Sequence, residues 1–105
     1  MPEGKALKVP GTVQVGGHVY QIRLNPDIKD DRVDARVNHC LQVVEIVPRW
    51  PQSVRRAALI HELLHIIDRI YANDSLNESQ ANALSEGLNQ VLPQLGLELD
   101  WSDIE

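Results

Sequence analysis

The sequence predicts one α+β domain in which a small β-sheet, a hairpin plus one strand, packs on two helices. Apolar and polar residues alternate in the first half of the chain, and apolar residues fall at three- and four-residue spacing after residue 52. A chain of 105 residues holds one hydrophobic core rather than two. We therefore expect residues 1–105 to form a single domain, with an aliphatic core because the chain has two Trp, two Tyr and no Phe.

The predicted sheet comes from two segments. In residues 12–24, the Gly16–Gly17 pair permits the positive φ angles of a tight turn, and the residues after it alternate as in a strand with one buried face. Residues 41–47 are short and β-branched, and we expect them to form a third strand. The acidic segment 27–34 between them is expected to be a solvated loop, since it lacks the ligand pattern of an EF-hand.

Two helices are expected in the second half of the chain. Apolar residues at helical spacing predict the first over residues 52–73, where Asn73 can adopt the left-handed conformation that ends a helix. Ser75 and Glu78 have the spacing of a capping box, which predicts a second helix that ends at Pro93. The remaining tail is expected to fold back onto the core.

Composition excludes several classes of protein. A net charge of −5 argues against a surface for nucleic acid or anionic membrane, because both need clustered Lys and Arg. One Cys can form neither an internal disulfide nor a multi-Cys zinc site. The sequence shows no signal peptide and no apolar run near the roughly 18 residues of a membrane span. We expect a cytoplasmic protein whose metal ligands, if any, are His and carboxylates.

The segment His61 to His65, His-Glu-Leu-Leu-His, carries the chemistry. Two His four residues apart on a helix share one face, so both can reach one Zn²⁺ at roughly 2.0–2.1 Å. Glu62 lies about 100° round the helix and is suited to take a proton from a water that the metal activates. The alternative is a chance match on an ordinary amphipathic helix. Apolar neighbours favour the metal, because a buried His pair without partners costs stability.

A catalytic zinc needs a third protein ligand and an open fourth position. Residues 66–71 contain no third His. In a simple antiparallel helix pair, Glu86 would lie closer in level to His61 than Glu78 does. The residue types alone leave six candidates for the third ligand: Glu78, Glu86, Asp68, His39, His18 and Cys40.

The residues after the motif resemble the gluzincins, the zincin clan whose third ligand is a Glu on a second helix. Residues 78–82, Glu-Ser-Gln-Ala-Asn, are similar to the Glu-x-x-Ala-Asn helix of ImmA/IrrE-type and phage-encoded small metallopeptidases. The resemblance covers about residues 41–92. It implies a zincin-like fold and a zinc-dependent metallopeptidase that hydrolyses peptide bonds.

The same resemblance assigns roles to particular residues. His61, His65 and Glu78 would hold one Zn²⁺ per chain, and Asn82 would support a ligand His from behind. Glu62 would be the general base that takes a proton from the zinc-activated water. In zincins a peptide substrate pairs with an edge strand above the metal, and we expect residues 41–47 to be that strand.

Asp68 and Tyr71 are further candidates near the motif, and two other functions are compatible with the sequence. Asp68 would orient a ligand His, bind a substrate amino group or lie exposed, and Tyr71 would stabilise an oxyanion or anchor the helix end. One alternative is a zincin-fold regulatory or binding protein with a mainly structural zinc, whose acidic segment 74–105 suits a basic partner. The other is a deformylase-like amidohydrolase that uses Cys40, since Cys40 and Leu41 match two residues of the deformylase cysteine segment.

Overall fold

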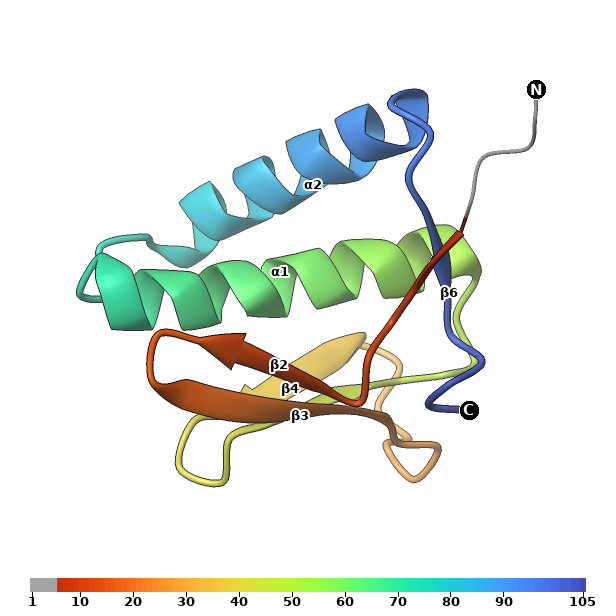
Figure 1. Ribbon diagram of the computed structural model, residues 1–105, viewed down its shortest axis with the longest axis horizontal. Helices are drawn as coiled ribbons and strands as arrows, with labels where there is room; N and C mark the ends of the chain where they lie inside the picture. The colour runs from red at the N-terminus through yellow and green to blue at the C-terminus, as the bar shows by residue number, and fades with distance from the viewer. Residues whose placement is uncertain (1–5) are drawn as a thin grey trace.

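The computed structural model describes residues 6–105, in which a four-stranded sheet is covered on one face by a helix and a second helix packs on the first (Figure 1). The sheet has the order β2-β3-β5-β4, formed by Thr12–Val15, His18–Leu24, Val43–Ile46 and Ala35–Asn38. Helix α1 (Gln52–Tyr71) lies on the sheet, and α2 (Glu78–Gln94) lies beside α1. The predicted α+β class with two helices is therefore confirmed, and the sheet is mixed and has one strand more than predicted.

The predicted hairpin is confirmed as the antiparallel pair β2 and β3, in which Val15 lies opposite His18. Gly16 has a φ of +59° in the turn between them. A Cβ atom on Gly16 would lie 2.9 Å from Cγ2 of Ile70, so the turn lies directly against α1. This close approach requires glycine both for the backbone conformation and for space.

The predicted third strand is β5, but it lies in the middle of the sheet, parallel to β3 and antiparallel to β4. The expectation that residues 41–47 form an edge strand is therefore wrong. The edge strand next to β5 is β4, residues 35–38, in a part of the chain where no strand was predicted. Ala35 and Val37 pack toward the core while Arg36 is exposed. This alternation spans only four residues after a charged loop, too few for a clear period of two.

The first and last strands of the described residues form a second, smaller sheet. Strands β1 (Ala6–Lys8) and β6 (Glu98–Asp100) pair in parallel. The indole of Trp101, just after β6, is 2% exposed and donates a hydrogen bond from Nε1 to Oε1 of Gln52 at 3.0 Å. The prediction that the tail folds back onto the core is confirmed for Leu99 and Trp101 but not for Leu95, which is 70% exposed. Trp101 joins the tail to the start of α1.

The start of α2 differs from the prediction. Its capping box is formed by Asn77 and Gln80, two residues later than the predicted pair of Ser75 and Glu78. The Asn77 side chain accepts a hydrogen bond from the Gln80 backbone N–H, and the Gln80 side chain accepts one from the Asn77 backbone N–H. Glu78 is therefore the first residue of α2, and its carboxylate is free of the capping role. The helix continues to Gln94 with Pro93 in its last turn.

Neither α1 nor α2 is long and apolar enough to cross a membrane.

Candidate metal centre

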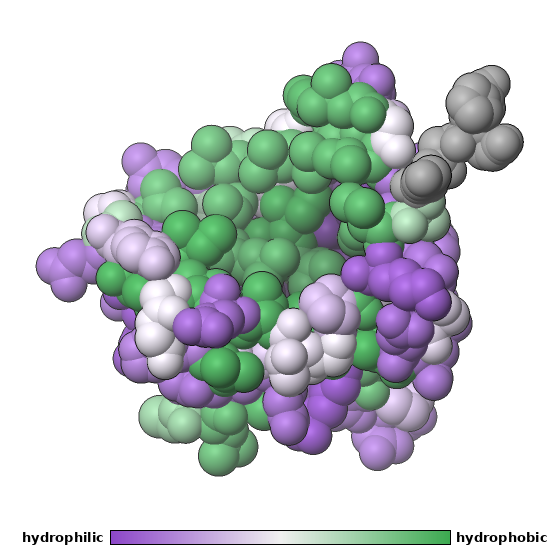
Figure 2. Space-filling model, viewed as in Figure 1, coloured by the Kyte–Doolittle hydropathy of each residue, from purple (hydrophilic) through white to green (hydrophobic). Residues whose placement is uncertain are grey.

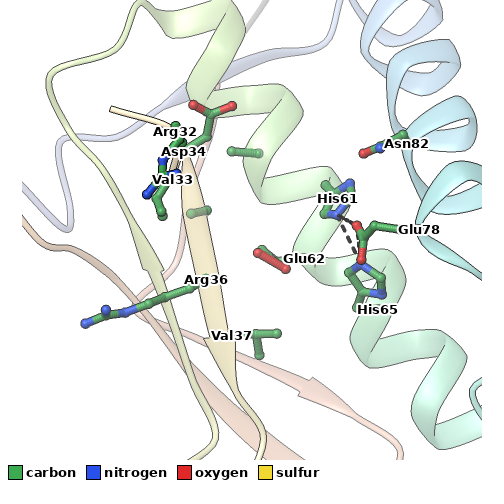
Figure 3. Close-up of a pocket in the computed structure, with 12 residues that line it drawn as sticks. Arg32, Val33, Asp34, Arg36, Val37, His61, Glu62, His65, Glu78 and Asn82 are labelled. Atoms are coloured by element: carbon green, nitrogen blue, oxygen red, sulfur yellow. Dashed lines mark hydrogen bonds and ion pairs between the residues drawn. The ribbon is translucent and has the colours of Figure 1, made fainter. Parts of the chain in front are cut away.

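Three potential metal ligands meet where the start of α2 approaches the middle of α1 (Figure 3). His61 and His65 lie one turn apart on α1, and their Nε2 atoms are 3.0 Å apart. Oε1 of Glu78 lies 2.8 Å from Nε2 of His61 and 3.3 Å from Nε2 of His65. One oxygen and two nitrogens therefore form a compact triangle between the two helices.

The triangle fits a small, tetrahedrally bound cation. In a tetrahedral zinc site with bonds of roughly 2.0–2.1 Å, neighbouring ligand atoms lie about 3.3 Å apart. The three distances between the ligand atoms here are between 2.8 and 3.3 Å. The imidazoles of His61 and His65 are partly exposed, and the Glu78 side chain is 70% exposed, so a fourth position is open to solvent.

The connection between the helices places Glu78. Asp68, which is 4% exposed, accepts hydrogen bonds from the backbone N–H groups of Ser75 and Leu76 at 2.9 and 3.0 Å. Asn77 then caps α2, so that Glu78 begins the helix beside His61. The alternative that Asp68 lies exposed is wrong, and among the described residues its carboxylate bonds to the connection rather than to His61 or His65.

The other candidates for the third ligand lie elsewhere among the described residues. Glu86 follows Glu78 by eight residues, about 12 Å along the helix axis, and is outside the ligand group. His39 bonds to the hydroxyl of Tyr20 through Nδ1 at 2.9 Å, and Nδ1 of His18 bonds to Gln42 at 2.8 Å. Cys40 is exposed and lines a different cavity from His61, which leaves the deformylase-like arrangement without its thiol ligand.

Glu62 lies on the floor of the same cavity. The residue is 7% exposed, and in Figure 3 its carboxylate lies between β4 and the two His. Burial raises the pKa of Glu62, while the charges of His61 and His65 oppose the increase. No other described residue donates a hydrogen bond to this carboxylate, so it is available to a proton on a molecule in the cavity.

The pKa of Glu78 is shifted in the direction opposite to that of Glu62. Burial alone would raise its pKa, but the hydrogen bonds and charges of His65 and His61 outweigh that effect and hold the pKa below its ordinary value. Glu78 is thus kept ionised, as a metal ligand must be. Glu62 and Glu78 are two carboxylates in one cavity whose surroundings shift their pKa values apart.

The cavity has a volume of about 490 Å³ and two walls. One wall is the helix side with the ligand group, Glu62 and Asn82. The other is formed by residues 32–37, the end of the charged loop and the edge strand β4. Sequence reasoning missed this second wall because it took the charged loop for a solvated turn and predicted no strand after it.

The two remaining predicted residues have different positions. Asn82 lines the cavity one turn after Glu78, but among the described residues it makes no hydrogen bond to His61 or His65. Tyr71 is outside the cavity, 70% exposed, with its hydroxyl close to Gly16. Of its two predicted roles, Tyr71 therefore fits the anchoring of the helix end.

Comparisons with protein family models, with curated proteins and with solved structures found no match for this chain.

Proposed function

We propose that the protein is a minimal zincin-like, zinc-dependent metallopeptidase that hydrolyses peptide bonds. The observation that carries the proposal is the pairing of a three-ligand group with a free, buried carboxylate in one cavity. His61, His65 and Glu78 supply the ligands, and Glu62 supplies the base. Together they match the catalytic pattern of two His, one carboxylate and an adjacent Glu.

Zinc is the metal that suits this donor set. Imidazole and carboxylate ligands in a tetrahedral arrangement, with one position open, are typical of catalytic zinc. When bound, zinc supplies Lewis acidity that polarises a carbonyl and lowers the pKa of water toward 7. The chain supplies the ligands, their spacing and a partly enclosed cavity.

Glu62 has the chemistry of the proton carrier. Its carboxylate takes a proton from water as the water attacks the peptide carbonyl, and then gives that proton to the nitrogen that leaves. Burial raises the pKa of Glu62 toward neutral pH. A group whose pKa is closer to the working pH can both accept and release a proton. The absence of a competing hydrogen bond among the described residues leaves both carboxylate oxygens free for this transfer.

A peptide substrate fits along β4. In the described part of the chain, this strand pairs with β5 on one side only, and residues 33–37 line the cavity on the other. An extended peptide can add to the free side through main-chain hydrogen bonds, which would place its backbone between β4 and the ligand group. We therefore assign to β4 the role that the sequence had suggested for residues 41–47.

The second candidate function is a regulatory or binding protein in which the metal is structural. It is favoured by the position of the ligands, since His61 and Glu78 belong to different helices and a bound metal would join α1 to α2. Such a link would stabilise a domain of this size whether or not the protein cleaves peptides.

Peptide cleavage by the zinc-loaded full chain, compared with the Glu62→Gln variant, distinguishes the two functions. We expect the wild type to cleave peptides from a random library and the variant to lose at least about 10²-fold in rate while retaining zinc. Glu86→Gln, an amide substitution on the exposed side of α2, is the matched control and should retain activity. Equal turnover by Glu62→Gln would refute the mechanism, and zinc binding without any cleavage by the wild type would favour the structural role.

A further inference from the structure

The face of the helix pair opposite the metal cavity is strongly apolar. Figure 2 shows it as a broad, hollowed hydrophobic surface over α1 and α2. We call this surface the helical face and define it by six exposed side chains: Ile67, Tyr71, Leu84, Leu88, Val91 and Leu95. Ile60 and Leu64 of α1, which are half-buried, lie on the same side of the helix.

Three residues of α2 and its C-cap, Leu95, have the spacing of a coiled-coil seam on the helical face. Leu84, Leu88, Val91 and Leu95 follow one another at intervals of four, three and four residues. They are between 38% and 70% exposed, whereas Ala81 and Ser85, on the adjacent side of α2, are buried. Helix α2 packs against α1. The four residues thus form an apolar stripe that stays partly exposed in the described part of the chain.

The charges of α2 are placed away from this stripe. The helix carries two charged residues, Glu78 and Glu86, and no Lys or Arg. At 100° per residue, Glu86 lies on the side of α2 opposite the centre of the stripe, and Glu78 lies on the side of the metal cavity. A charged partner would find no opposite charges on the stripe. Two copies of the stripe would meet without like-charge repulsion within it.

The exposed area is large for a chain of this size. The six side chains leave on the order of 600 Å² exposed, the upper end of what a monomer usually presents as one patch. A standard interface uses about 800 Å² from each partner, which the half-buried side chains of α1 would bring within reach. The area thus suits a symmetric pair, in which the same surface is used twice.

We propose that the helical face is the interface of a two-fold symmetric homodimer, with the α2 stripes of the two copies packed antiparallel across the axis. In this arrangement Leu84 packs near Leu95 of the other copy, and Leu88 packs near its Val91. The metal cavity lies on the other side of the helix pair and stays open in the dimer. The proposal is independent of the chemistry assigned to the cavity.

Sedimentation velocity of the full chain over a range of concentrations tests this interface. We expect the wild type to approach a mass of about twice 11.8 kDa at high micromolar concentration. The Leu88→Glu variant should raise the dissociation constant of the dimer by at least about tenfold, because it places a carboxylate in an apolar contact. Leu41→Glu is the matched control, since Leu41 is 71% exposed in the turn before β5 and lies outside the helical face.

Circular dichroism of each variant establishes that it is folded, since both substitutions are at exposed positions. If Leu88→Glu loses its fold, Leu95→Glu repeats the test at a position that is 70% exposed. A wild type that remains monomeric at every concentration would overturn the proposal and leave the face to another protein. A dimer weakened equally by Leu41→Glu and Leu88→Glu would overturn it as well.

Discussion

Asp68, near the end of α1, and Ser75, in the connection to α2, are joined by two hydrogen bonds to one carboxylate oxygen. Oδ1 of Asp68 accepts from the backbone N–H of Ser75 at 2.9 Å and from its hydroxyl at 3.2 Å. The other oxygen accepts from the backbone N–H of Leu76 at 3.0 Å. This buried carboxylate fixes the connection and so determines where Glu78 begins α2.

Replacing Asp68 with Ala should therefore weaken the metal centre without touching a ligand. Hydrogen bonds to a buried carboxylate contribute strongly, and we expect a loss of about 2–4 kcal/mol in the free energy of unfolding. Because Glu78 would no longer be held beside the His pair, zinc affinity should fall by about tenfold. Urea unfolding measures the first effect, and competition with a chelator measures the second.

The matched control is Asp74→Asn, in the same connection, because Asp74 has a φ of +56°, which Asn adopts readily. The carboxylate of Asp74 is largely exposed, and its contact with Arg69 is 3.9 Å long, so we expect a loss below about 1 kcal/mol. Zinc affinity that is unchanged in folded Asp68→Ala would show that the connection does not position Glu78.

Gly16 should tolerate no side chain. Its φ of +59° and the 2.9 Å approach of Ile70 to a Cβ atom predict that Gly16→Ala destabilises the protein by about 1–3 kcal/mol. Gly17→Ala is the control, since a Cβ there has nothing within 4 Å. Thermal unfolding of both variants gives the comparison. Similar losses at the two positions would contradict the contact between the turn and α1.

Glu45 predicts a dependence of stability on pH. The hydrogen bond from Arg36, with smaller contributions from Asn25 and Arg23, lowers the pKa of this carboxyl below its ordinary value of 4.5. A pKa that is lowered by folding stabilises the folded state above the unfolded-state pKa, and the gain is lost as the pH falls through the folded-state pKa. Because Arg36 is more than half exposed, we expect about 1 kcal/mol or less.

Urea unfolding of the wild type and Glu45→Gln at several pH values measures this contribution. The wild type should be the more stable at pH 7, and the difference should shrink below about pH 4.5 as Glu45 takes up a proton. A difference that stays constant between pH 7 and pH 3 would exclude the ionised carboxylate as its cause.

The helices and strands whose hydrophobic pattern repeats over several residues could be predicted from the sequence. The hairpin was predicted because its alternating residues follow the Gly16–Gly17 turn. The two helices were predicted in the right order because apolar residues repeat at helical spacing over several turns. The positions of His61 and Glu62 followed from one rigid helix. Glu78 was one of several candidates from residue types alone, and the resemblance to gluzincins favoured it.

The remaining features depend on contacts between distant segments. Four residues of alternation in β4 are too few to outweigh the charged loop before them, so the second wall of the cavity was missed. Ser75 carries a capping signal in sequence, but the buried Asp68 takes its N–H and hydroxyl and moves the start of α2 by two residues. The role of Asp68 itself follows only from the path of the connection.

Metal content is the most direct test of the central claim, that His61, His65 and Glu78 form one zinc site. The wild-type chain, Glu78→Ala and Glu86→Ala would be purified with zinc, dialysed against a weak chelator and analysed by atomic emission. We predict about one zinc per chain in the wild type and in Glu86→Ala, and a loss of most of the zinc in Glu78→Ala. Equal zinc in the two variants, or a wild type without zinc, would contradict the account.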